Sequence, residues 1–278
     1  MEIHVFLAVL FAAILHASWN AIIRRGGDRF QGMLLLTVTQ AAMGLIMALA
    51  VPLPSGVVWF WLLGSGVLHT TYKLFLAAAY QHGDLSRVYP IARGSAPMIV
   101  VLVGFFLLPD TVQNKEYFGI AMIGIGVMMM AGGVLKSGEA RKLIPLALGS
   151  AICTAGYSIV DGMGARIALD ATMFTAWLFI FDGMFFTIFT AATRGAKAFK
   201  ASRRAWMIGT IAGALSLITY WIAVWAMTVA PIALVAAVRE TSVLFAVLIG
   251  IFVLGEKTSL GKIMAALVIV SGIIVIRL

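Results

Sequence analysis

The chain has 278 residues, of which 62% are hydrophobic and only 11% are charged, and its formal net charge is +9 at pH 7. Soluble domains carry about 25% charged residues, so this composition excludes an ordinary globular protein and indicates a polytopic membrane protein. Most basic residues lie in short gaps between apolar runs, which argues against a nucleic-acid-binding surface. The single cysteine, Cys153, excludes an internal disulfide.

Ten apolar runs follow one another along the chain, and a helix needs about 20 such residues to cross a bilayer. The first run is predicted to be a span and not a cleaved signal peptide, because Glu2 precedes it in place of a positive charge. The gaps are too short to hold a soluble domain, so the predicted fold class is an all-α polytopic membrane protein with ten transmembrane helices. The spans are expected at residues 3–23, 31–51, 57–80, 86–108, 116–135, 143–165, 170–192, 204–228, 231–254 and 260–277.

The distribution of basic residues predicts the orientation. Fourteen of the 20 lysines and arginines lie in one set of alternate loops, whereas Lys115, Arg166 and Arg277 lie on the opposite side. Loops rich in lysine and arginine face the cytoplasm. We therefore expect both termini on the non-cytoplasmic side of the membrane, which we predict to be a bacterial inner (plasma) membrane.

The two halves of the chain repeat each other. The segment RGSAPMIVVLVGFFLLPD at 93–110 aligns with RETSVLFAVLIGIFVLGE at 239–256, so that Arg93 matches Arg239 and Asp110 matches Glu256. A unit of five spans is odd, so the second copy enters the membrane from the other side. The sequence therefore predicts an inverted five-plus-five repeat, 1–137 and 138–278, and transporters commonly bind substrate where such repeats meet.

These features, together with HASWNA in the first span and FVLGE closing the ninth, resemble the ten-helix EamA branch of the drug/metabolite transporter superfamily. The resemblance covers the whole chain. It implies that helices 1, 3, 4, 6, 8 and 9 surround a central cavity, that helices 5 and 10 pack outside, and that the protein exports amino acids or other small metabolites. Asp110 stands where the family pattern has Glu, a mild departure.

Polar residues within the spans are candidates for the cavity wall, because an ionisable side chain in a membrane is costly and commonly functional. His69, Tyr72 and Lys73, for example, share one face of the third span at helical spacing. The predicted substrate-cavity residues are His16, Trp19, Asn20, His69, Tyr72, Lys73, Tyr80, Tyr89, Arg93, Tyr157, Ser158, Asp161, Tyr220, Arg239 and Glu240.

Structural alternatives stay open for several of these residues. Lys73 could extend to the cytoplasmic headgroups, and each of the two arginines could pin a helix break or pair with Glu240. His16, His69 and Asn20 could bridge helices through hydrogen bonds. Asp182 stands in the seventh span, which the resemblance puts at the periphery; it could pair with a neighbouring helix, and the sequence gives no firm account of it.

The expected cavity is biased toward positive charge, which suits a carboxylate-bearing substrate better than a lipophilic cation. A zwitterion fits well, with lysine or arginine on its carboxylate and with aromatic faces or Asp161 on its ammonium. We predict a secondary transporter that exports amino acids, aromatic ones included, by alternating access. The alternatives are export of another anionic or zwitterionic metabolite, and a non-transporting intramembrane enzyme or structural protein.

Coupling to protons through Asp161, Glu240 or a histidine and simple uniport are both consistent with the sequence. The segment GEKTSLGKI at 255–263 departs from a phosphate loop in spacing and in its last residue. We therefore expect no ATPase subunit. We also expect no enzymatic activity, because the motifs HExxH and GxSxG are absent, and we expect no metal, cofactor or nucleic-acid partner. The expected partners are the small-molecule substrate and the lipid bilayer, and the bundle could act as a monomer.

Overall fold

The computed structural model describes residues 1–24, 29–79, 85–130, 140–253 and 259–278, with the backbone alone at 24, 29, 85–90 and 140–142. Two predicted cavity residues, Tyr80 and the side chain of Tyr89, therefore lie outside the described residues, as does Glu256 of the repeat.

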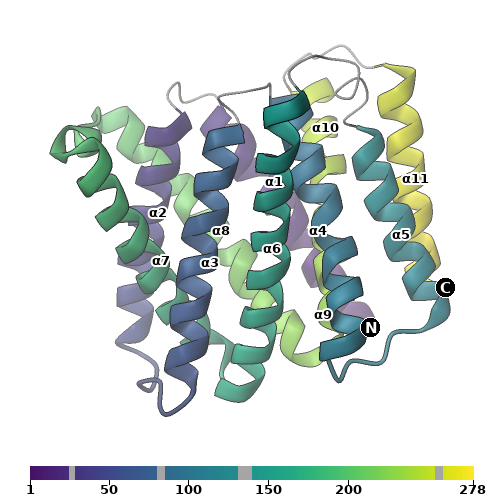
Figure 1. Cartoon of the computed structure of the whole chain (residues 1–278), viewed down its shortest axis with the longest axis horizontal. Coiled ribbons are helices and arrows are strands. Elements are labelled where there is room, and N and C mark those ends of the chain that lie inside the picture. Colours follow the sequence, from purple (N-terminus) through teal and green to yellow (C-terminus); the bar gives the residue numbers. More distant parts are fainter. Residues whose placement is uncertain (25–28, 80–84, 131–139, 254–258) are drawn as a thin grey trace.

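The regular structure of the described chain is helical throughout (Figure 1). The first half holds α1 (Ile3–Arg24), α2 (Arg29–Ala48), α3 (Val58–Ala79), α4 (Leu85–Leu107) and α5 (Asn114–Met129). The second half holds α6 (Ala140–Ala168), α7 (Ala171–Arg194), the short 3₁₀ helix η2 (Ala196–Phe199), α8 (Arg203–Val229), α9 (Ile232–Glu240), α10 (Ser242–Phe252) and α11 (Leu260–Arg277). Each predicted span corresponds to one of these helices, except the ninth.

The predicted ninth span is divided into α9 and α10 at Thr241. Both the backbone N–H and the hydroxyl of Thr241 donate to the carbonyl oxygen of Val238, at 3.1 and 2.6 Å. A threonine side chain that bonds the preceding turn competes with the regular helical ladder. The matching span of the first copy, α4, has no such break and continues from Leu85 to Leu107.

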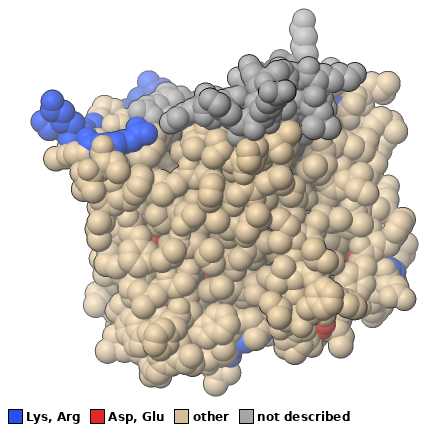
Figure 2. Space-filling view, viewed as in Figure 1, with Lys and Arg blue, Asp and Glu red and all other residues tan. Residues whose placement is uncertain are grey.

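Length and composition mark the bundle as a membrane protein. Among the described residues, seven helical stretches are long and apolar enough to cross a bilayer, with α9 and α10 counted as one stretch. The helix α3 is long enough but is not among the seven, because polar residues such as His69, Thr71 and Lys73 lower its hydropathy. Figure 2 shows a broad band of uncharged side chains across the visible face, and large apolar residues such as Phe11, Phe106 and Ile188 are exposed.

The contacts between helices come in mirrored pairs, as an inverted repeat requires. The contact between α3 and α6 has its equivalent between α8 and α1. The contact between α2 and α8 likewise has its equivalent between α7 and α3. Two further pairs, α2 with α7 and α5 with α11, join equivalent helices of the two copies. Because α1 and α6 run in opposite directions through the bundle (Figure 1), the second copy is inverted relative to the first.

Glycines allow the equivalent helices to approach closely. In the α5–α11 pair, a Cβ at Gly119 would lie 2.8 Å from the carbonyl oxygen of Gly272, and a Cβ at Gly272 would lie 2.8 Å from that of Gly119. Gly209 and Gly213 of α8 likewise allow close packing against Leu35 and Leu36 of α2. The pair α5–α11 stands at one edge of the bundle (Figure 1), outside the cavity described below.

The centre of the bundle is built around α9, all of whose residues are buried. Its Ile232, Val235 and Val238 belong to the largest apolar cluster, together with Val9 of α1 and Ile123 of α5. Close packing of this kind holds α9 in place, and its last two residues, Arg239 and Glu240, are charged residues of the site described below.

A polar clamp ties the helix ends together on the face where the chain begins and ends (Figure 1). Arg166, near the end of α6, donates to the Asp110 carboxylate at 2.7 Å and to the carbonyl oxygens of Met227 and Ala230 at 2.8 and 2.9 Å. The same carboxylate accepts the backbone N–H of Ile232, at the start of α9, at 2.8 Å. The clamp therefore joins α6, α8, α9 and the segment that follows α4.

Substituting Gly119 by Ala tests the tight α5–α11 contact. The added Cβ would meet a backbone oxygen at 2.8 Å and Ile276 at 2.6 Å, so we expect the free energy of unfolding to fall by about 1–3 kcal/mol. Thermal unfolding in detergent, followed by tryptophan fluorescence, measures this loss. Gly64→Ala is the matched control, because its Cβ would meet only Val160, at 3.9 Å; equal losses in the two variants would contradict the packing described here.

Candidate functional site

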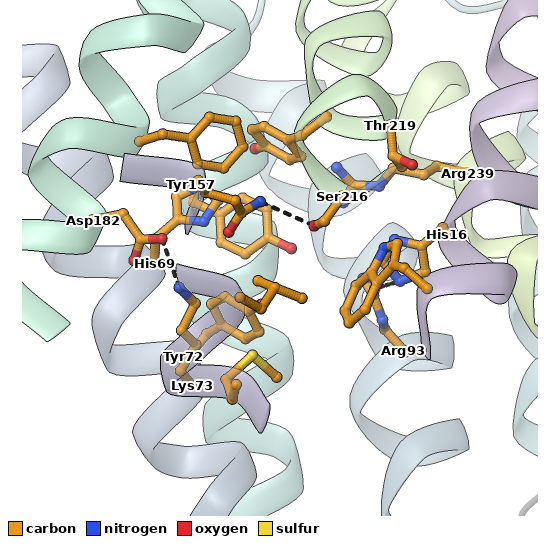
Figure 3. A pocket seen from close by; sticks show the side chains of 16 residues that line it. His16, His69, Tyr72, Lys73, Arg93, Tyr157, Asp182, Ser216, Thr219 and Arg239 are labelled. Carbon is orange, nitrogen blue, oxygen red and sulfur yellow. Dashed lines mark hydrogen bonds and ion pairs between the residues drawn. The ribbon is translucent and has the colours of Figure 1, made fainter. Parts of the chain in front are cut away.

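A cavity lies between the two copies and takes its wall from eight helices. Its empty space amounts to about 500 Å³, a value that includes the part open to solvent. Figure 3 shows its lining, in which Lys73 and Asp182 face each other at one end while Arg93, Arg239 and His16 gather at the other. The lining residues are His16, Trp19, Met33, Leu36, Gln40, His69, Tyr72, Lys73, Arg93, Tyr157, Phe179, Asp182, Ser216, Thr219, Tyr220 and Arg239.

The wall includes two helices that the resemblance did not imply. Helix α2 contributes Met33, Leu36 and Gln40, and α7 contributes Phe179 and Asp182. The expectation that the seventh span is peripheral is therefore corrected, because α7 packs against both α2 and α3 and presents one face to the cavity. Helices α5 and α11 contribute no residue to the lining.

At one end of the cavity, two arginines from different copies share one carboxylate. Arg93 of α4 donates to Glu240 Oε1 at 3.2 Å, and Arg239 Nη2 lies 3.9 Å from the same oxygen. Arg93 also donates to Nε2 of His16, so His16 accepts at that nitrogen. The matched arginines of the sequence repeat thus meet in space, with a local excess of positive charge.

Two donor atoms of Arg239 have no hydrogen-bond partner among the described residues. Its Nη2 donates weakly to Ser158 Oγ at 3.4 Å, while its Nε and Nη1 have no partner within the described part of the chain. The side chain is only 3% exposed, and buried donors without acceptors are costly. An arginine with two free donors on a cavity wall is suited to hold an anionic group.

At the opposite end, Lys73 is paired inside the protein. Its ammonium donates to Asp182 Oδ2 at 2.6 Å and to Thr37 Oγ1 at 2.9 Å, and the two charged side chains are 4% and 1% exposed. Lys73 therefore does not extend to the headgroups. Asp182, which the sequence left without an account, is its counter-ion; the signal available in the sequence was that Lys73 required a carboxylate within another span.

A third polar group lies behind the wall. His69 Nε2 is 2.9 Å from Asp161 Oδ2, and the Tyr220 hydroxyl donates to the same oxygen. The His69 ring stacks on Tyr157 with 4.1 Å between centroids. Both His69 and Tyr220 line the cavity, whereas Asp161 is completely buried and does not.

Aromatic rings connect the two ends of the cavity. The guanidinium carbon of Arg239 lies 5.8 Å from the Tyr157 ring centroid and 5.5 Å from that of Tyr220. Phe179 packs against Tyr220, and Tyr72 against Tyr157 and His69. These faces could contact an apolar group or a cation.

Four predicted residues lie beside the cavity and not on its wall. Asn20 donates to the carbonyl oxygen of His16 at 2.8 Å, and Ser158 to that of Thr154 at 2.8 Å. Asp161 and Glu240 are buried behind their partners. The sequence analysis did not include the uncharged lining residues Met33, Leu36, Gln40, Phe179, Ser216 and Thr219, among which Gln40 donates to Ser216 at 3.0 Å.

The charges of the cavity are more balanced than the sequence suggested. Lys73 is neutralised by Asp182, so the positive bias is confined to the arginine pair. Among the residues that the structure describes, no group of three or more His, Cys, Asp and Glu side chains could hold a metal ion. The side chains on the wall offer charge, hydrogen bonds and aromatic contact.

Comparison with known protein families shows the family of the chain. A profile of the EamA-like transporter family matches residues 4–132 and again residues 141–278. The chain belongs to this family. It is therefore a transporter of the drug/metabolite type, with the family's two-repeat architecture. No curated protein matches the sequence significantly.

A crystal structure of a protein with 17% sequence identity aligns with a TM-score of 0.79, covering 99% of this chain and 98% of the other. At that identity the likeness shows the shared fold alone.

A double-mutant cycle tests the Lys73–Asp182 pair. Lys73→Met leaves a buried carboxylate without its cation, so we expect the free energy of unfolding to fall by about 3–5 kcal/mol; Asp182→Leu should cost a similar amount. The double variant should recover most of the loss, since no uncompensated charge remains. Thermal unfolding in detergent gives all the values, and strictly additive losses would show that the two side chains do not depend on each other.

Proposed function

We propose that this EamA-like transporter exports amino acids, aromatic ones included, from the cytoplasm across the bacterial inner membrane by alternating access. The observation that carries this proposal is the arginine pair, with two free donors on Arg239, placed between the copies and next to aromatic faces. The second candidate is export of another anionic or zwitterionic metabolite, which the same arginines favour.

The arginine end of the cavity suits a carboxylate. The free Nε and Nη1 of Arg239 could each donate a charge-assisted hydrogen bond to an oxygen of an anionic group such as a carboxylate. Glu240 already serves both Arg93 and Arg239, so an incoming anion would balance the remaining charge. A lipophilic cation would be repelled at this end.

The ammonium of the substrate would lie on the aromatic part of the wall. Tyr157 and Tyr220 line the cavity, and their ring centroids lie 5.8 and 5.5 Å from the guanidinium carbon of Arg239, which is compatible with the short distance between the two charged groups of an amino acid. The apolar residues Met33, Leu36 and Phe179 complete a wall that could contact an apolar or aromatic side chain.

The clamp formed by Arg166 and Asp110 supports alternating access. It holds cavity-lining helices together on the face of the termini, while His16, His69 and Lys73 lie in the halves of α1 and α3 that are farther from that face. The clamp would therefore close the termini side in this conformation and open in the other.

The basic residues around η2 support the orientation. Lys197, Lys200, Arg203 and Arg204 are exposed on the face opposite the termini, and Figure 2 shows lysine and arginine side chains gathered at that edge. By the positive-inside rule this face would be cytoplasmic, which puts both termini outside.

Counterflow into proteoliposomes with labelled amino acids tests the substrate. We expect unlabelled amino acids to compete in the wild type, and Arg239→Gln to weaken apparent affinity about ten- to hundredfold, as loss of a hydrogen bond to a charged group implies. The matched control, Arg204→Gln, removes an exposed arginine outside the cavity and should leave affinity unchanged. Competition by organophosphates or nucleotide sugars, with none by amino acids, would overturn the proposal.

Breaking the clamp tests the conformational cycle. The test uses Thr219→Cys in a Cys153→Ser background, so that the cysteine to be labelled lies on the cavity wall. An impermeant thiol reagent is added on the termini side. The cysteine should react faster with this reagent when Arg166 is changed to Gln. We expect an increase of about tenfold, because charge-assisted hydrogen bonds favour the closed state. Lys115→Gln, on the same side and exposed, should have no effect; unchanged labelling in a folded Arg166→Gln variant would argue against the gating role.

A further inference from the structure

The segment that joins α7 to α8 concentrates exposed positive charge on the face opposite the termini. Five basic residues fall within eleven consecutive positions, and the side chains of all five are exposed: Arg194, Lys197, Lys200, Arg203 and Arg204. We propose that these residues, called the basic patch below, bind the headgroup of an anionic phospholipid from the leaflet that this face meets. The site would be independent of the transported substrate.

The basic patch has no acidic counterpart. Between Asp182 and Glu240 the sequence contains no aspartate or glutamate, and within the described part of the chain no ion pair joins the patch to a carboxylate. Lys73, Arg93 and Arg166, by contrast, each meet a carboxylate. Like charges gathered without a counter-ion repel one another, so binding of an anion that reaches several of them is favoured.

Helix α2 holds the basic patch in place. The Gln31 amide nitrogen Nε2 donates to the carbonyl oxygen of Lys200 at 2.9 Å, and the Arg194 guanidinium carbon lies 3.5 Å from the centroid of the Phe30 ring. Gly195 between them has a φ of 70°, a left-handed conformation that glycine adopts without strain. The patch is therefore part of the folded surface, and its backbone does not have to be ordered when an anion binds.

The surroundings of the basic patch fit a lipid. Apolar side chains are exposed within about two helical turns of it, Ile188 and Phe189 on α7 and Met207 and Ile211 on α8. A phosphate bound to the cations would therefore have its acyl chains beside an apolar helix surface. Trp206, two residues after the patch, is half-buried, and tryptophan is enriched at the interface between membrane and water.

The basic patch lies at an outer corner of the bundle and not at the cavity. Figure 1 shows the end of α7 at the edge opposite α5 and α11, and Figure 2 shows lysine and arginine side chains projecting at that corner. None of the five residues lines the cavity. The patch is therefore better placed to meet the surrounding lipid than to attract a soluble substrate into the cavity.

A bound headgroup would connect two helices of the cavity wall. Arg194 is the last residue of α7 and Arg203 the first of α8, and these helices contribute Asp182 and Tyr220 to the cavity lining. One phosphate in contact with both helix ends would hold them together on the face opposite the clamp.

Native mass spectrometry of the purified protein in detergent tests the site. Phosphatidylglycerol and phosphatidylcholine with identical acyl chains are titrated, and the dissociation constant of the first bound lipid is measured for each. We expect the wild type to bind phosphatidylglycerol about a hundredfold more tightly. In the double variant Lys197→Gln Lys200→Gln this affinity should fall about ten- to thirtyfold, since each cation contributes about fivefold, while the affinity for phosphatidylcholine stays unchanged.

Two further variants separate the patch from charge in general. Lys115→Gln with Arg277→Gln is the matched control, because it removes two exposed cations on the termini side and should preserve the preference for phosphatidylglycerol. Lys197→Arg with Lys200→Arg keeps the charge and should preserve it as well.

Three results would overturn the proposal. The first is equal affinity of the wild type for the two lipids, a comparison that needs no variant to fold. The second is the same loss in the matched control as in the glutamine variant of the patch. The third is complete competition by soluble glycerophosphate at the concentration of the lipid, because the site would then serve a free anion.

Discussion

A charge inside a membrane must be compensated by the protein itself, and this requirement organises the whole molecule. Lys73 meets Asp182, Arg93 meets Glu240, His69 meets Asp161, and Asp110 meets Arg166. In every one of these pairs, one partner belongs to the first copy of the repeat and the other to the second. Because an unpaired charge would be very costly there, the polar pairs specify how the copies face each other.

Two kinds of contact therefore hold the copies together. Glycine contacts join α5 to α11 at one edge, where backbones touch closely, while the middle of the interface consists of polar pairs around a cavity. Close contacts between small residues are rigid because they leave no space for rearrangement. Hydrogen-bonded pairs next to water can exchange partners, which suits the region where a substrate must enter and leave.

Hydropathy was sufficient to predict the spans, because the bilayer imposes length and composition on every helix, and the sequence repeat with five spans per copy predicted the inversion. They did not reveal the pairing of Lys73 with Asp182, since the residues lie in different copies and no local pattern joins them. Counting charges also overstated the positive bias of the cavity. Gln40 and Ser216 were not predicted as cavity residues, because an uncharged polar residue in a span gives little signal in the sequence. The division of the ninth span was not predicted either, because it depends on a hydrogen bond from the Thr241 hydroxyl to the preceding turn.

The divided ninth span distinguishes two copies that are otherwise equivalent. Its counterpart, α4, is continuous, so Arg239 stands beside a helix terminus whereas Arg93 lies within an unbroken helix. Exchanging the conformations of the two copies would consequently not give an arrangement of the same energy. In the alternating-access cycle proposed above, symmetry therefore gives the empty protein no reason to populate its two orientations equally.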